Sequence, residues 1–195
     1  WNFCSLLVSG ISGLALNFLI IASYGAETLG VFNQVFTVYI VFSQVAVCGI
    51  QFSVFQRCAA TTDQTERQYS TIAAVLLTLV VAITTCTFLL VIPVGKIFSS
   101  SAVEEGINYI IPAILFFALS KVATGCVNAL GKMRWYAVLQ AARFVFFLVG
   151  YAVFLIAGYE SSMLPIIISF SELAVLLLAV FAIREMFVLA PISAL

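Results

Sequence analysis

The sequence predicts an all-α integral membrane protein, and three observations lead to this fold class. Of the 195 residues, 64% are hydrophobic and 8% are charged, whereas soluble domains have about 45–50% apolar and about 25% charged residues. The mean hydropathy of +1.22 excludes a disordered chain, because low hydrophobicity is what keeps chains unfolded. The apolar residues also form long continuous runs, which favour helices over the short alternating strands of a membrane barrel.

Six runs are long enough to cross a bilayer as helices, which takes about 20 mostly apolar residues. We expect these spans at residues 3–23, 31–55, 71–94, 107–130, 135–157 and 163–183, with the polar patch 56–70 as a loop. In the first span, Ser9, Gly13 and Asn17 form a face of small residues suited to close helix contact. The chain is thus predicted to be a single six-helix domain over residues 1–195.

The chain ends and the loops suggest how the domain sits in the membrane. The sequence begins at Trp1 with an apolar run and lacks the basic segment of a signal peptide. We therefore expect a fragment of a longer chain. Basic residues favour the cytoplasmic side of a membrane. On one side of the predicted spans lie Arg57, Arg67, Lys132, Arg134 and Arg184, and on the other side lies Lys96. We therefore expect the basic side, and both chain ends, in the cytoplasm.

The charge balance and the missing residue types argue against several function classes. The net charge is zero, so nothing attracts nucleic acid. There is no histidine and Asp63 is the single aspartate, which removes most metal sites and acid–base constellations. The five cysteines show no short paired spacing and are interpreted as small apolar packing residues. We expect no catalytic residue, no metal, no cofactor and no nucleic-acid partner, and a membrane enzyme is disfavoured.

Three ionisable residues lie inside the predicted spans: Lys121, Arg143 and Glu172. Burying such a group costs about 2.5–3.5 kcal/mol on insertion scales, so each needs a partner or a wet cavity. A rise of about 1.5 Å per residue puts the three within about one helical turn of depth. Two cations against one carboxylate leave one positive charge, for which an anionic ligand is the expected partner. A purely structural ion pair involving Glu172 is the alternative.

Polar residues recur at helical spacing on four of the spans, and each set shares one helix face. The sets are Lys121, Thr124, Gly125 and Asn128; Tyr136, Gln140, Arg143 and Gly150; Ser169 and Glu172; and Thr37, Gln44, Cys48 and Gln51. Together they predict the walls of an aqueous groove. Hydrogen bonds between helices are the alternative explanation for each set.

Three segments resemble motifs of one transporter family. Residues 24–33 (YGAETLGVFN) resemble the turn between the first two helices of polysaccharide biosynthesis proteins. Residues 49–57 (GIQFSVFQR) are similar to the end of the second helix in that family, and residues 128–137 (NALGKMRWYA) to its short basic turn before the fifth helix. These proteins are the O-antigen-type flippases of the multidrug/oligosaccharidyl-lipid/polysaccharide exporter superfamily.

The resemblance implies a transporter of about twelve or more helices in two lobes, of which these six helices form the N-terminal lobe. Such a protein moves a polyprenyl-pyrophosphate-linked oligosaccharide across the bacterial cytoplasmic membrane by alternating access, for surface polysaccharide biosynthesis. Its partners are this anionic lipid-linked substrate, the bilayer, and the C-terminal lobe, or a second copy if 195 residues are the complete chain.

The resemblance also suggests roles for individual residues. Lys121 and Arg143 are expected to bind the anionic headgroup. Gln140 and Gln44 are expected to bind sugar, with Asn128 as a further substrate-binding residue. Glu172 is expected either to hold one of the cations in place or to respond to a proton.

Other function classes stay open on the sequence alone. A cation-coupled multidrug exporter of the same superfamily often carries a carboxylate in its first helix, where this chain has Asn17. A peptidoglycan-precursor flippase is barely separable from the first interpretation. A structural or assembly protein that dimerises is the alternative if the chain is complete.

Overall fold

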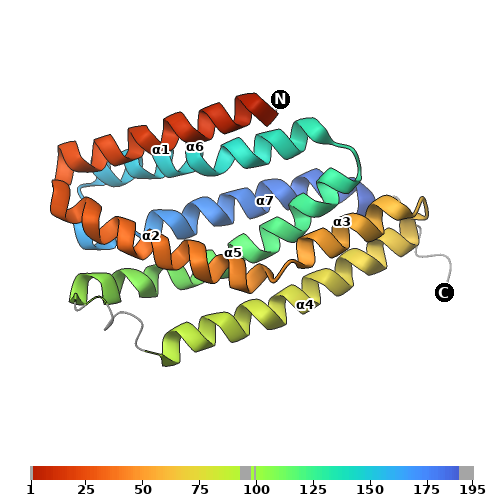
Figure 1. Cartoon of the computed structure of the whole chain (residues 1–195). Coiled ribbons are helices and arrows are strands. Elements are labelled where there is room, and N and C mark those ends of the chain that lie inside the picture. Colours follow the sequence, from red (N-terminus) through yellow and green to blue (C-terminus); the bar gives the residue numbers. More distant parts are fainter. Residues whose placement is uncertain (1, 93–97, 99, 189–195) are drawn as a thin grey trace.

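The computed structural model describes residues 2–92, 98 and 100–188, and over these ranges the chain is helical without a strand (Figure 1). The helices are α1 (Asn2–Tyr24), α2 (Ala26–Val47), α3 (Ile50–Ala60), α4 (Gln64–Val91), α5 (Ser101–Ala129), α6 (Met133–Ala157), the 3₁₀ turn η2 (Ser161–Met163) and α7 (Ile166–Val188). Six of the described helices are long and apolar enough to cross a membrane. The prediction of an all-α protein with six candidate membrane spans is confirmed.

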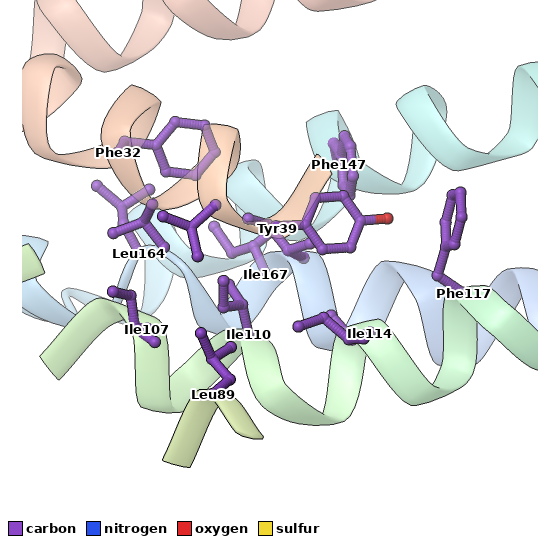
Figure 2. Close-up of a cluster of buried hydrophobic side chains, with 14 of the residues drawn as sticks. Phe32, Tyr39, Leu89, Ile107, Ile110, Ile114, Phe117, Phe147, Leu164 and Ile167 are labelled. Atoms are coloured by element: carbon purple, nitrogen blue, oxygen red, sulfur yellow. The ribbon is translucent and has the colours of Figure 1, made fainter. Parts of the chain in front are cut away.

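Helix α5 lies at the centre of the bundle and is its most buried span. It packs against α2, α3, α4 and α7, while α1 lies on α6 and α2 (Figure 1). The main core forms where α2, α5 and α7 meet, around Phe32, Tyr39, Ile110, Ile114 and Ile167 (Figure 2). Helix α5 also contacts α6, so this central position lets it present side chains to five neighbouring helices.

Large apolar side chains cover the outside of the bundle. Phe3, Leu14, Phe18 and Val91 are each more than 70% exposed, at 71%, 73%, 72% and 75%. Soluble monomers rarely expose contiguous apolar surface on this scale. The outer surface is therefore suited to contact with lipid chains, as expected for a multi-pass membrane protein.

Contacts between distant segments show which loops share an end of the bundle. The side-chain amides of Gln64 and Gln68 donate to the carbonyl of Met186, and Lys132 Nζ donates to the carbonyl of Ala182. The α3–α4 loop, the α5–α6 turn and the end of α7 therefore lie together. The start of α1 lies at the same end (Figure 1). The five basic residues assigned to one side from the sequence gather there; Lys96 is outside the described residues.

The predicted second span, residues 31–55, differs from the structure at both ends and in the middle. Helix α2 already begins at Ala26 and ends at Val47, and α3 begins at Ile50. Between them, Cys48 and Gly49 both have left-handed backbone angles, with φ of 46° and 74°. Glycine adopts this conformation freely, whereas a residue with a Cβ pays about 1–2 kcal/mol. An apolar run alone cannot show such a break.

The polar patch 56–70, predicted as a loop, is mostly helical. Only residues 61–63 separate α3 from α4. Asp63 caps α4 by accepting a hydrogen bond from the Thr65 backbone N–H at 3.0 Å. Arg67 Nε donates to the carbonyls of Cys58 and Thr61, at 2.9 Å each. The charges of the patch thus close a helical hairpin.

The remaining spans agree with their predictions within a few residues, with three differences. Helix α4 begins at Gln64 rather than at 71. Helix α5 begins at Ser101 rather than at 107, and the 163–183 span is resolved into η2 and α7, which runs on to Val188. The end predicted for the third span, residue 94, lies outside the described residues.

The small-residue face predicted on the first span is half-buried, and within the described residues it makes no close helix contact at Gly13. The buried residues of α1 are Ser5, Ser12, Leu16 and Ile20, and a Cβ added at Gly13 meets no atom within 4 Å. Close helix approach occurs instead at Gly125 of α5, where an added Cβ would lie 2.8 Å from the Gln51 carbonyl oxygen. This contact brings α3 directly onto α5.

Candidate functional site

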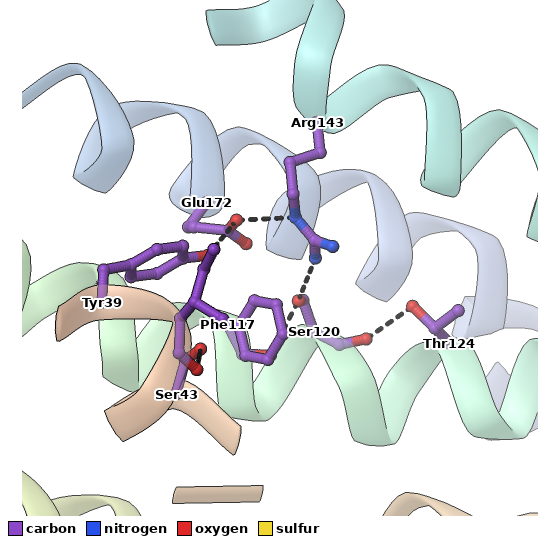
Figure 3. Close-up of polar contacts among 8 residues, drawn as sticks. Tyr39, Ser43, Phe117, Ser120, Thr124, Arg143 and Glu172 are labelled. Atoms are coloured by element: carbon purple, nitrogen blue, oxygen red, sulfur yellow. Dashed lines mark hydrogen bonds and ion pairs between the residues drawn. The ribbon is translucent and has the colours of Figure 1, made fainter. Parts of the chain in front are cut away.

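A buried ion pair joins two of the charged residues predicted from the sequence. Glu172 of α7 is fully buried, and its Oε1 lies 2.6 Å from Nε of Arg143 on α6, whose side chain is 13% exposed (Figure 3). The Tyr39 hydroxyl of α2 donates to the same Oε1 at 2.6 Å. Arg143 Nη2 lies 3.5 Å from Ser120 Oγ on α5. The network therefore ties four helices together.

The geometry of the pair shows how completely Glu172 depends on its neighbours. Arg143 Nε has no well-directed hydrogen bond, and Glu172 Oε2 has no hydrogen-bond partner, so the contact is a single short ion pair and not a two-pronged one. Removing one partner of a buried pair costs about 3–5 kcal/mol, because an uncompensated charge stays behind. We infer that this network holds the bundle together.

Two cations approach the same aromatic ring on α5. Arg143 Cζ lies 4.7 Å and Lys121 Nζ lies 5.2 Å from the centroid of Phe117, both within the roughly 6 Å range of a cation–π contact. Arg143 is also paired with the carboxylate of Glu172. Within the part of the chain that the structure describes, Lys121 makes no ion pair. The positive charge left over after pairing therefore resides on Lys121.

Lys121 opens into a pocket of about 250 Å³ between α3, α5 and α6. The lining residues are Gln51, Phe52 and Phe55 of α3, Lys121, Thr124, Gly125 and Asn128 of α5, and Tyr136 and Gln140 of α6. We call this space the Lys121 pocket. Gln140 Nε2 donates to the Tyr136 hydroxyl at 3.0 Å. Gln51 Oε1 is buried without a hydrogen-bond partner. The pocket thus offers one cation and several amide and hydroxyl groups.

The structure brings together some of the predicted site residues and separates others. Lys121, Asn128 and Gln140 line one pocket. Arg143 and Glu172 lie about one helical turn beyond it in the ion pair, since Arg143 follows Gln140 by three residues. Gln44 is exposed on α2 and does not line the pocket. The predicted groove with walls on four spans is therefore a narrower pocket whose third wall is α3.

Sequence reasoning missed the residues that complete the ion-pair network. Tyr39, Phe117 and Ser120 were not among the predicted site residues. Phe117 and Ser120 precede Lys121 and Thr124 by four residues each, so extending that stripe by one turn would have found them. Tyr39 stands in an apolar stretch away from the stripe of its own helix, and no sequence signal marks it.

Among the described residues, the cysteines and acidic residues form no second candidate site. Cys58 and Cys126 are buried, and Thr71 Oγ1 lies 3.7 Å and 3.3 Å from their sulfurs. Cys86 is partly buried, whereas Cys4 and Cys48 are exposed. Among the described residues, no group of three or more Cys, Asp or Glu side chains is placed to hold a metal ion. The candidate site is therefore the Lys121 pocket and the ion pair beside it.

Comparison of the chain with protein-family models, with curated proteins and with solved structures finds no match.

Proposed function

We propose that this domain is one lobe of a two-lobed flippase that moves a polyprenyl-pyrophosphate-linked oligosaccharide across a bacterial cytoplasmic membrane by alternating access. The observation that carries the proposal is Lys121, a cation inside a membrane span that has no ion-pair partner among the described residues and faces a polar pocket. An unpaired cation at membrane depth is costly unless an anion meets it. A pyrophosphate supplies that anion.

The size and lining of the pocket support a headgroup site. A drug-sized ligand typically needs about 300–1,000 Å³, so 250 Å³ suits the charged head of a lipid and not a whole oligosaccharide. Gln51, Asn128 and Gln140 can donate and accept hydrogen bonds, as sugar hydroxyls near the pyrophosphate require. The rest of the glycan would lie in front of the pocket, on the side where a second lobe is proposed.

Arg143 takes a different role in this proposal from the one expected at first. Its charge is matched by Glu172, and it does not line the pocket. We assign Lys121 to the ligand, and Arg143 with Glu172 to holding the helices that form the pocket walls.

The test is leaflet-resolved analysis of lipid-linked oligosaccharides in host cells depleted of the protein. Accumulation of a polyprenyl-pyrophosphate glycan on the cytoplasmic side, reversed by the wild-type gene and not by Lys121→Met, is the expected result. Arg57→Gln is the matched control, because it removes one positive charge from an exposed position outside the pocket. The size of the accumulated species separates an O-antigen-type cargo from a peptidoglycan precursor.

A cation-coupled multidrug exporter is the second candidate, because Glu172 is a carboxylate inside a membrane span with one oxygen lacking a hydrogen-bond partner. An unchanged lipid-linked pool together with new sensitivity to cationic drugs would favour this candidate and contradict the flippase.

A further inference from the structure

The break between α2 and α3 lies directly beside the Lys121 pocket. Backbone hydrogen bonding across it is sparse: Cys48 N donates to the Gln44 carbonyl at 3.1 Å and Phe52 N to the Gly49 carbonyl at 3.0 Å. A continuous helix would bond every residue to the fourth one before it. The two left-handed residues, Cys48 and Gly49, therefore join two separate helices.

Helix α3 provides one whole wall of the pocket. Gln51, Phe52 and Phe55 line it from α3, and they face Lys121 on α5 and Gln140 on α6. The direction that α3 takes away from the break therefore sets how wide the pocket opens.

Helix α3 packs on α5 through its buried apolar side chains Ile50, Val54 and Cys58, and through two close contacts between small groups. At one point the backbone of Gln51 meets Gly125, which has no side chain. At the other, Cys58 and Cys126 lie on either side of the Thr71 hydroxyl at sulfur–oxygen distances of 3.7 Å and 3.3 Å. Thiols are weak hydrogen-bond donors and acceptors. Neither of these two close contacts involves a charge pair or a strong hydrogen bond. The strong hydrogen bonds run from Arg67 Nε to the Cys58 and Thr61 carbonyls, and they tie the far end of α3 to α4, so this end of α4 moves with α3.

Cys48 makes the observed conformation costly. A left-handed residue with a Cβ is disfavoured relative to helix, and the cost persists only where the surrounding packing maintains it. A second arrangement, in which residues 48–49 return toward helix and α3 points elsewhere, would release this backbone cost.

We propose that α3 is a hinged arm that pivots at Cys48–Gly49 and opens the Lys121 pocket by moving its α3 wall away from α5. This inference goes beyond the proposed function and does not depend on the identity of the cargo. The arm covers Cys126, which is fully buried in the closed arrangement. Opening exposes that thiol, so its reactivity reports the open population.

The experiment measures the rate at which N-ethylmaleimide labels Cys126 in the purified protein, read by peptide mass spectrometry. Labelling of a buried group by local opening follows the population of the open state. Gly49→Ala places a Cβ on a left-handed residue and penalises the closed arrangement, so the rate should rise about five- to thirty-fold. Cys48→Gly removes the same penalty, so the rate should fall by a similar factor.

Two controls separate hinge opening from general loosening. Gly158 has φ of 69°, close to the 74° of Gly49, and an added Cβ meets nothing within 4 Å at either position. Gly158→Ala therefore introduces the same backbone strain at the end of α6, and it should leave Cys126 labelling unchanged. Cys86 on α4 serves as an internal standard, and its rate should not follow the hinge variants.

Two labelling results would contradict the hinge at Cys48–Gly49. Equal Cys126 rates in the wild type, Gly49→Ala and Cys48→Gly would show that residues 48–49 are not a hinge. A rise in Gly158→Ala as large as that in Gly49→Ala would show that the labelling reports overall stability. The predicted order is Gly49→Ala fastest, the wild type and Gly158→Ala together, and Cys48→Gly slowest.

Discussion

Arg143 and Lys121 approach the same aromatic ring, yet their surroundings differ completely. Arg143 meets Glu172 and Ser120 in a network that also takes in Tyr39. Lys121 has the ring of Phe117 on one side and a polar pocket on the other. Depth in the membrane does not by itself make a charge a ligand site. A buried charged side chain is available to a ligand only if the protein does not already supply its counter-charge.

The largest effect on stability is expected when the ion pair loses one partner. Glu172→Ala leaves Arg143 largely buried without its counter-charge, and the free energy of unfolding should fall by about 3–5 kcal/mol. Thermal or denaturant unfolding in detergent, followed by circular dichroism, measures the loss. Replacing both residues, as Arg143→Met with Glu172→Leu, should recover most of it, because apolar pairs of similar size replace buried ion pairs at little cost. A Glu172→Ala protein as stable as the wild type would refute the structural role.

The next largest effect is expected at Tyr39. Tyr39→Phe removes the hydrogen bond to Glu172, and hydrogen bonds to charged groups contribute about 1.5–3 kcal/mol. Tyr151→Phe is the matched control, because the Tyr151 hydroxyl donates to the neutral carbonyl of Leu19 and should cost about 0.5–1.5 kcal/mol. The same unfolding experiment compares the two variants. Equal losses would mean that Tyr39 does not support the carboxylate.

A substitution at Gly125 tests how tightly α3, one wall of the Lys121 pocket, packs against α5. Gly125→Ala sets a Cβ 2.8 Å from the Gln51 carbonyl oxygen, which forces α3 away and should cost about 1–3 kcal/mol. In α1, Gly10→Ala meets no atom within 4 Å and should be neutral or stabilising by up to about 1 kcal/mol. Unfolding measurements on both variants check the contrast. A neutral Gly125→Ala would mean that α3 has room to move without strain.

The smallest effect on stability is expected at Lys121 itself. Lys121→Met removes a cation that makes no ion pair among the described residues and keeps a side chain of similar length. The unfolding midpoint should stay at or slightly above that of the wild type, because an unpaired charge is costly inside a bilayer. A loss of several kcal/mol would place Lys121 in the structural network with Arg143.

The sequence predicted the parts of the molecule that follow from hydropathy and charge. Long apolar runs fixed six spans, and three ionisable residues within them pointed to one region of the bundle. It could not show that Cys48 and Gly49 break a span, because neighbouring apolar residues continue through the break. Nor could it show that residues 56–70 form a capped hairpin, since polar residues occur both in loops and at helix ends.

The candidate site was predictable only in part, for a similar reason. Helical spacing correctly grouped Lys121 with Asn128, because residues of one helix face stay together whatever the fold. Spacing says nothing about which faces meet, so it could not show that Gln44 lies outside the Lys121 pocket. The partner of Glu172 was left open between two cations, and only the packing of α6 on α7 selects Arg143.

Lys121 is proposed to bind the anion and Arg143 to stabilise the fold, and isothermal titration with inorganic pyrophosphate separates these two roles. The titration compares the wild type, Lys121→Met, and the double variant in which Met and Leu replace Arg143 and Glu172. We predict that Lys121→Met lowers the affinity at least about tenfold, a loss of about 1.4 kcal/mol, while the folded double variant binds like the wild type. Wild-type affinity in Lys121→Met would show that Lys121 does not bind the anion, and an equal loss in the folded double variant would show that Arg143 binds it as well.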